Sequence, residues 1–210
     1  MSLFSFLATF FDFAALVLQI FTMIGNTYNR PFLRELYFAR LHLGSQFVDF
    51  GLWNYCTGRN EEVTQCSNPV AAYNWVDAAG EIPNAAVDGL QNLDRVFLAN
   101  FILYWIGLGL TFFAMIITLM SGFRRGSDLL AAFVTFVSAL VMIVVFVILL
   151  VISLKGINSV RDAGVSDATG HLGPSMWMTL GAMVALLISS FWYCITCCFP
   201  GRRVRAEEKA

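Results

Sequence analysis

The chain has 210 residues, of which 58% are hydrophobic and 13% are charged, and its mean hydropathy is +0.70. Soluble globular domains carry about 25% charged residues, so this composition excludes an ordinary soluble protein. The formal net charge of −1 provides no basic field that would favour a nucleic acid partner.

Four apolar runs follow one another along the chain, and each is long enough to cross a bilayer core of about 30 Å as a helix. We expect membrane spans at residues 3–25, 96–121, 129–154 and 175–199. An even number of spans places both termini on the same side of the membrane. The first run could also be a signal peptide, but it lacks a basic n-region and a small-x-small cleavage site, so we expect it to be retained.

Lysine and arginine near the span ends predict the orientation of the chain. They are dense in the turn 122–128 and in the tail 200–210, where they include Arg124, Arg125, Arg202, Arg203 and Arg205. The segments 26–95 and 155–174 together hold only seven basic residues among 90. We therefore expect the turn and the tail in the cytosol, beside the anionic inner leaflet, and the segments 26–95 and 155–174 outside the cell.

The first span carries a polar stripe. Asp12 lies near mid-depth, and Gln19 and Asn26 follow it at steps of seven residues on the same helix face. Ionisable residues inside a membrane are costly and are functional candidates by default. One interpretation is an interhelical hydrogen bond, and the other is an ion or proton path. We favour the hydrogen bond because the other spans offer no basic partner at mid-depth and few further polar residues.

The segment 26–95 is the only place for a folded ectodomain. Residues 34–43 and 46–55 are rich in Leu, Tyr, Phe and Val with partial alternation, which predicts two strands joined by a turn at Gly44-Ser45. Pro83 and Asn84 indicate a helix start, and we expect that helix to run from residue 85 into the second span.

Cys56 and Cys66 lie in the same extracellular segment, where an oxidising environment favours a disulfide. Closing a loop of this size removes unfolded-state entropy worth about 3 kcal/mol. A metal site is the weaker interpretation, because structural zinc takes four ligands and no histidine lies nearby. Trp53 is either a recognition residue or a packing residue at the disulfide and the outer leaflet, and the preference of Trp for membrane interfaces favours packing.

Small residues recur at intervals of four on the later spans, which lets helices approach closely. The rows are Gly107 and Thr111, then Ala131, Thr135 and Ala139, then Gly181, Ala185 and Ser189. These rows could pack within one chain or between chains. We expect packing within the chain, because a four-helix bundle must bury such faces first.

Three cysteines, Cys194, Cys197 and Cys198, cluster at the inner end of the fourth span, close to the arginines of the tail. Juxtamembrane cysteines are candidates for S-acylation. Zinc binding is a weaker alternative because a second pair of ligands is missing, and the cysteines could also fill apolar space.

Motifs of catalysis are missing from the sequence. It contains no Gly-x-Ser-x-Gly elbow, no Gly-rich phosphate loop and no His-bearing metal cluster. His42 and His171 are the only histidines, and they lie in different extracellular segments without a motif around either. We therefore expect a protein without enzymatic activity, metal or cofactor.

The pattern Gly51, Leu52, Trp53, Cys56 and, after nine residues, Cys66 lies in the first extracellular segment of a four-span chain. This pattern resembles the signature of the claudin-like superfamily, which includes the fungal Sur/PalI family of plasma-membrane eisosome domains. The fuller stretch 50–69 is more similar to the fungal family. Claudins carry another Trp early in this loop, whereas no Trp precedes Trp53 here.

The resemblance implies a membrane all-α bundle of four transmembrane helices with a small disulfide-stapled extracellular β-sheet, as one domain over residues 1–210. It implies a non-enzymatic tetraspan that organises a plasma-membrane domain by lateral assembly and by contact with sterol or sphingolipid, linked to the cell wall and membrane stress. An accessory or regulatory subunit of a larger transporter, synthase or receptor is the alternative, and a channel that uses Asp12 is less favoured. The partners implied are membrane lipids and membrane proteins, including further copies of the chain.

Overall fold

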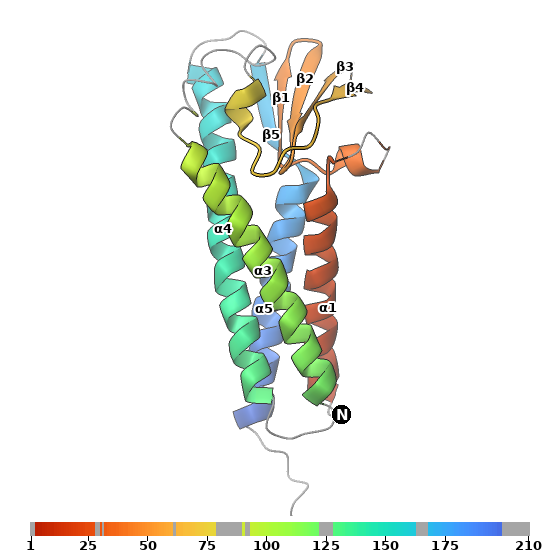
Figure 1. Ribbon diagram of the computed structural model, residues 1–210, viewed down its shortest axis with the longest axis vertical. Coiled ribbons are helices and arrows are strands. Elements are labelled where there is room, and N and C mark those ends of the chain that lie inside the picture. Colours follow the sequence, from red (N-terminus) through yellow and green to blue (C-terminus); the bar gives the residue numbers. More distant parts are fainter. Residues whose placement is uncertain are drawn as a thin grey trace, which may run out of the picture.

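The computed structural model describes residues 3–27, 30, 32–60, 62–78, 90, 93–121, 128–162 and 168–198. Within these residues, four long helices form an up-and-down bundle, and a β-sheet covers one end of it (Figure 1). The helices are α1 (Leu3–Ile24), α3 (Asp94–Ser121), α4 (Asp128–Asp162) and α5 (Pro174–Cys198). Each is long and apolar enough to cross a membrane, as the fold class expected from the sequence requires.

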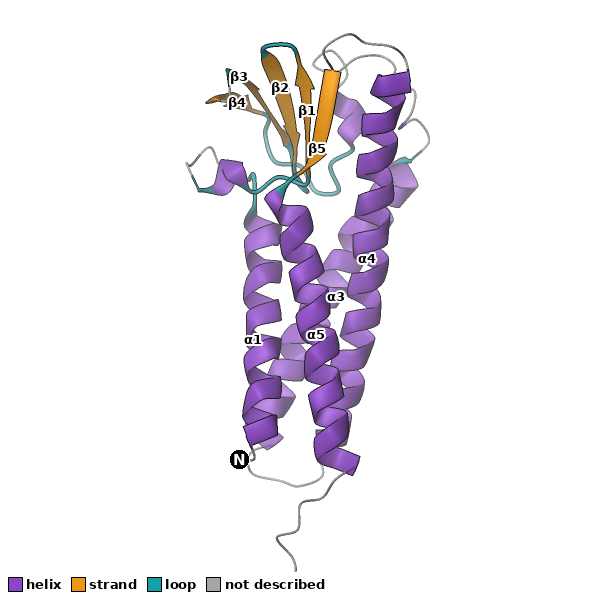
Figure 2. Ribbon diagram, turned by 180° about the vertical axis from the view of Figure 1, so that it is seen from behind, coloured by secondary structure: helices purple, strands orange, loops and turns teal. Residues whose placement is uncertain are grey.

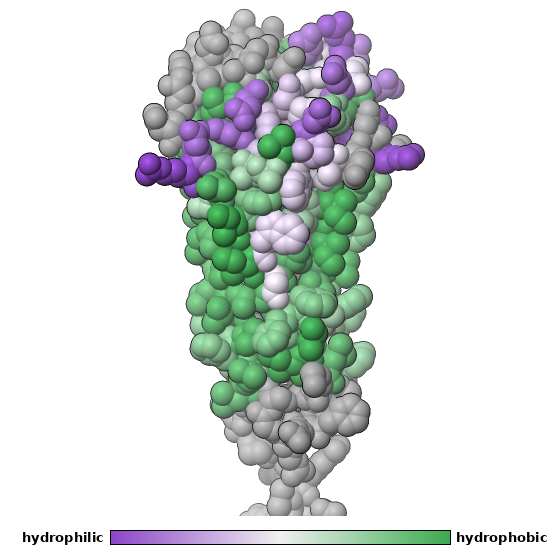
Figure 3. Space-filling model, viewed as in Figure 1, coloured by the Kyte–Doolittle hydropathy of each residue, from purple (hydrophilic) through white to green (hydrophobic). Residues whose placement is uncertain are grey.

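Small side chains line the inside of the bundle, and large apolar side chains face outward. Ala131 and Ala139 of α4 are fully buried, and a Cβ at Gly107 of α3 would come within 2.8 Å of the Met142 sulfur. Large apolar side chains are exposed on all four helices, and the described helix surface on the face shown in Figure 3 is mostly apolar. The rows of small residues therefore serve packing within the chain, and the outward faces are left for lipid.

The helix α4 is longer than a membrane crossing requires. The apolar run that defines the predicted span ends at residue 154, but the helix continues from residue 155 to Asp162, about 12 Å at a rise of 1.5 Å per residue. This extension stands beside the sheet (Figures 1 and 2). It gives the sheet a rigid helix to pack against, which so small a sheet needs because it cannot enclose a core alone.

The sheet has five antiparallel strands in the order β4-β3-β2-β1-β5 (Figure 2). Of the segments 26–95 and 155–174, the first supplies β1 (Ala39–Leu43), β2 (Gln46–Phe50), β3 (Tyr55–Arg59) and β4 (Glu62–Cys66). The second supplies β5 (Ala168–Leu172), which the sequence did not predict and which pairs with β1. The predicted turn at Gly44-Ser45 is confirmed, because Leu43 faces Gln46 across the hairpin.

The two strands predicted from the sequence are too long. Residues Leu33–Glu35 form a short 3-10 helix, η1, so β1 begins only at Ala39. The second strand ends at Phe50, where residues 51–54 turn the chain into β3. The predicted helix start at Pro83 and Asn84 lies outside the described residues. The helix does not run without a break from residue 85 into the second span, because Leu93 is not helical and α3 begins at Asp94.

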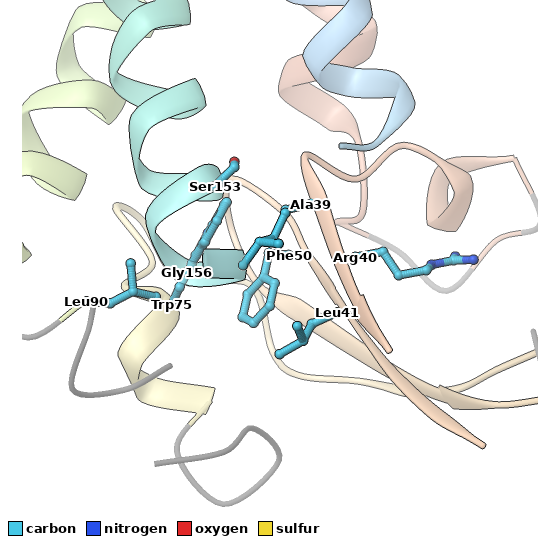
Figure 4. A pocket seen from close by; sticks show the side chains of 9 residues that line it. Ala39, Arg40, Leu41, Phe50, Trp75, Leu90, Ser153 and Gly156 are labelled. Atoms are coloured by element: carbon cyan, nitrogen blue, oxygen red, sulfur yellow. The ribbon is translucent and has the colours of Figure 1, made fainter. Parts of the chain in front are cut away.

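The inner face of the sheet packs on α4 and on the segment that precedes α3. Phe50 stacks on Trp75 of the 3-10 helix η2 (Trp75–Ala78), with ring centroids 4.8 Å apart. A cavity of about 20 Å³ remains at this contact, bordered by Leu90 and by Gly156 of α4 (Figure 4). Because that volume holds at most one water molecule, the sheet and α4 are closely packed.

Candidate functional site: the joint between sheet and helices

Trp53 joins the sheet to two membrane helices. Its indole N–H donates a hydrogen bond of 2.6 Å to the main-chain carbonyl oxygen of Met23, in the last turn of α1. The last carbonyls of a helix have no partner within the helix, so this bond satisfies one of them. The Trp53 ring also meets Phe101 of α3 edge-on, with ring centroids 4.9 Å apart. Trp53 therefore acts as a clamp between the sheet, α1 and α3.

Asn26 lies two residues beyond the end of α1, where the chain leaves the helix. Its backbone is left-handed, with φ at +62°, which Asn tolerates better than most residues and which commonly ends a helix. Its N–H donates a hydrogen bond of 2.8 Å to the carbonyl oxygen of Leu33. The Oδ1 atom of its buried side-chain amide lies 2.9 Å from the Cys56 Sγ atom. Because a disulfide sulfur carries no hydrogen, this contact is a hydrogen bond only with the amide N–H turned toward the sulfur.

The predicted disulfide between Cys56 and Cys66 is confirmed. It joins facing residues of β3 and β4, and Cys56 is fully buried. Gly51 lies beside the same site, where a Cβ would come within 2.9 Å of the Asn26 Cβ, and Leu52 is buried in the core. The Gly-Leu-Trp and cysteine pattern thus marks one structural unit, which fastens the sheet to the outer end of α1.

Asp12 and Gln19 of the predicted polar stripe are fully buried on the side of α1 that faces the bundle. Asn26 is also fully buried, but it lies beyond the end of α1 at Ile24 and contacts the sheet instead. The Asp12 Oδ2 atom lies 3.4 Å from the Tyr193 hydroxyl of α5 and 3.5 Å from the Thr135 hydroxyl of α4, and both hydroxyls donate to it. In the described part of the chain, Asp12 Oδ1 has no hydrogen-bond partner. Residues from three helices therefore meet at Asp12, as an interhelical hydrogen-bond site requires.

A second polar layer lies around Gln19. Its side-chain amide donates a hydrogen bond of 3.1 Å to the Thr111 hydroxyl of α3, and Thr111 shares a bond of 2.7 Å with the Ser138 hydroxyl of α4. The Tyr104 hydroxyl of α3 donates to the main-chain carbonyl of Gln19 at 3.3 Å. These bonds run between helices at a depth where water is scarce, so they help to set how the helices pair.

The outer face of the sheet carries a cluster that is absent from the predictions made from the sequence. Arg40 and Asp49 face each other on β1 and β2 and form a bidentate ion pair of 2.5 and 2.8 Å. The Arg40 guanidinium also lies over the rings of Tyr37 and Phe47. Burial raises the pKa of Asp49 to about 6, against the opposite effect of Arg40. Counting outward from the predicted turn pairs residue 40 with residue 49, so the sequence held a signal for this contact.

The two histidines lie together on this face, with His42 and His171 stacked and their ring centroids 5.4 Å apart. The Tyr37 hydroxyl lies 3.2 Å from His171 Nε2, within hydrogen-bond distance. Partial burial and the nearby His42 and Arg40 lower the pKa of His171. The pairing of β5 with β1 brings these residues together, and no local pattern indicated that pairing. Among the residues that the structure describes, no group of three metal-ligating side chains occurs.

Other predicted site residues lie away from the joint. Cys194 is exposed on α5, and the side chains of Cys197 and Cys198 lie outside the described part of the chain. The basic residues of the turn and the tail also lie outside the described residues, and they are Arg124, Arg125, Arg202, Arg203 and Arg205.

Comparison with known proteins assigns this geometry to a family. The SUR7/PalI family matches residues 4–189, a range that holds the Trp53 clamp, the disulfide and the polar stripe of α1. No curated protein matches the chain. The four apolar helices, the five-stranded antiparallel sheet and the disulfide fit the claudin-like tetraspan fold that the resemblance implied. The chain is therefore a multi-pass membrane protein of the SUR7/PalI family.

Proposed function

We propose that this protein is a non-enzymatic organiser of a plasma-membrane domain, which acts by lateral contact with lipids and with other membrane proteins, including further copies of itself. In this proposal both termini lie in the cytosol and the sheet lies outside the cell. The observation that carries it is the division of the bundle into a bonded interior and an apolar exterior. Asp12 and Gln19 are buried among other helices, while Phe10, Phe112 and Phe133 are each at least half exposed on the outside.

An exterior of this kind contacts lipid tails and other apolar helices, which are the contacts that lateral assembly uses. The clamp at Trp53 supports a role in lateral assembly, because it holds the sheet at one position on the bundle. The sheet then presents the same surface to every neighbouring membrane protein. Acylation of Cys194, which is exposed, would strengthen attachment at the inner leaflet. The family resemblance supports the proposed setting, a domain that contains sterol or sphingolipid and is linked to the cell wall and membrane stress.

The test is purification of the tagged full-length chain from native membranes in mild detergent, with mass spectrometry of the proteins and lipids that co-purify. An unrelated four-span protein, tagged and purified in the same way, measures the background. Self-association with sterol or sphingolipid enriched over this control, and without a partner of fixed stoichiometry, supports the proposal. One large partner at fixed stoichiometry contradicts it and makes the chain an accessory subunit. A monomer without enriched lipid also contradicts it.

A further inference from the structure

Two large apolar side chains are exposed in the described part of the ectodomain, one just before η1 and one in the loop that follows β4. They are Phe32, which is 59% exposed, and Val70, which is 57% exposed. All other exposed large apolar side chains among the described residues belong to the four membrane helices. A single exposed hydrophobic residue needs no explanation, but two that border the same membrane surface do.

Phe32 extends the lipid-facing surface of α1. It directly precedes η1, and its ring meets that of Phe21 edge-on with centroids 5.7 Å apart. Phe21 lies in the membrane span of α1 and is itself 39% exposed. Figures 1 and 2 show η1 beside the outer end of α1, projecting sideways from the bundle. Phe32 therefore continues outward a surface that the bilayer covers.

Val70 is tied to the outer end of the same helix. Its N–H donates a hydrogen bond of 2.8 Å to the carbonyl oxygen of Trp53, whose indole bonds to Met23 in the last turn of α1. In Figure 1 the gold loop that follows β4 runs below the sheet, level with the outer end of α1. Through Trp53, Val70 is therefore connected by two hydrogen bonds to the last turn of α1.

Two neighbouring features indicate the same boundary. Trp177, in the first turn of α5, is 60% exposed, and Trp prefers the interface between lipid tails and head groups. Arg30 is exposed two residues before Phe32. A long basic side chain there can hold its charge among the phosphates while an apolar neighbour reaches below them. Apolar and basic residues in such proximity are typical of segments that lie on a bilayer.

We propose that the underside of the ectodomain rests in the interfacial layer of the outer leaflet, with Phe32 and Val70 inserted into it. The sheet then does not stand free above the membrane but is held on it at two points in addition to the four spans. The occupant of this apolar surface is the bilayer, because Phe32 is continuous with Phe21, which the bilayer already covers.

Site-directed spin labelling tests this contact. Labels are placed at Phe32→Cys and Val70→Cys, and the control is Ser45→Cys, in the turn at the tip of the sheet away from the bundle (Figure 1). In the parent chain the three cysteines at 194, 197 and 198 are replaced by serine, so only the disulfide pair remains. The full chain is reconstituted in phosphatidylcholine liposomes. Power saturation then compares collisions with oxygen, which partitions into the bilayer, and with a water-soluble nickel chelate.

We expect the labels at 32 and 70 to collide more with oxygen than with the nickel chelate, and the label at 45 to show the reverse. Collisions dominated by nickel at 32 or 70 would overturn the proposal. Shielding of either label from both reagents would also overturn it, because a protein surface would then cover the site. An intact disulfide and a single peak in size exclusion establish that each variant is folded.

A second measurement needs no substitution. The wild-type chain is placed in liposomes that contain a lipid with a photoreactive diazirine near the glycerol backbone, and adducts are mapped by mass spectrometry. Adducts on the peptides that contain Phe32 and Val70, without adducts at Ser45, support the proposal. Their absence at both peptides, while Trp177 is modified, contradicts it.

Discussion

Replacing Trp53 by phenylalanine should destabilise the folded protein although an aromatic ring remains. The change removes the indole N–H, so the Met23 carbonyl oxygen loses the partner that now lies 2.6 Å away. A buried acceptor without a partner costs about 1–3 kcal/mol. Because Trp53 is only partly buried, water can satisfy some of this loss, and we expect about 1–2 kcal/mol. For a chain of this size that lowers Tm by roughly 2–8 °C.

Trp53→Ala should cost more, about 3 kcal/mol, because it also removes the contact with Phe101. Thermal unfolding of the purified variants in lipid nanodiscs, followed by circular dichroism, measures both changes. Trp177→Phe is the matched control, since that indole is 60% exposed and its loss should leave Tm unchanged.

Equal Tm values for the wild type and Trp53→Phe would refute the stabilising hydrogen bond and leave Trp53 with a packing role alone. The packing role has its own test. The double variant Trp53→Ala/Phe101→Ala should be less destabilised than the sum of the two single variants, by about 0.5–1.5 kcal/mol for the aromatic pair.

Four further outcomes are expected. Gly156→Ala should raise Tm by the equivalent of about 0.5–1 kcal/mol, because glycine weakens a helix interior. The added Cβ would lie 3.7 Å from Leu90, which is an ordinary van der Waals contact. A lower Tm would contradict this prediction. Reducing the disulfide should lower the free energy of unfolding by about 3 kcal/mol, which thermal scans with and without reductant measure. An unchanged Tm would show that the disulfide does not stabilise the fold. Partial burial lowers the pKa of His171, so the unfolded chain binds a proton at this imidazole more tightly than the folded chain does. The stability that is present above about pH 6.5 is therefore lost as the pH falls. Tm should decline less steeply on acidification in His171→Asn than in the wild type. Asp12→Asn should leave both Tm and the proton flux into liposomes that contain the protein at wild-type values. If the wild type conducts protons and this variant does not, the result would favour a proton path through Asp12.

The small sheet illustrates how the two parts of the molecule depend on each other. Five short strands cannot enclose a core, so the sheet buries its inner face on Trp75 and on the end of α4 that extends beyond the membrane. The disulfide joins β3 to the edge strand β4, and the Trp53 clamp fastens the sheet to the last turn of α1. We expect loss of any one of these contacts to loosen the sheet before it affects the membrane helices.

Much of the candidate site could be predicted because its signals are local. The four apolar runs, the turn at Gly44-Ser45 and the cysteine pair are each contained in one short segment, and each was found from composition or spacing. The pair of Arg40 and Asp49 was not predicted, but its signal is also local, because a known turn defines which residues face each other across a hairpin. The overlong strands show the limit of this approach, since partial alternation does not mark where pairing stops.

The sequence by itself determined the membrane spans, the hairpin and the disulfide, because periodicity and covalent chemistry act over neighbouring residues. Only the tertiary structure decided that β5 joins β1 and brings His171 beside His42, that Trp53 caps α1, and that Phe32 lies against Phe21. Each of these contacts joins segments whose own patterns do not specify a partner. The partner is selected by which surfaces the packed helices leave exposed and which carbonyls they leave without hydrogen bonds.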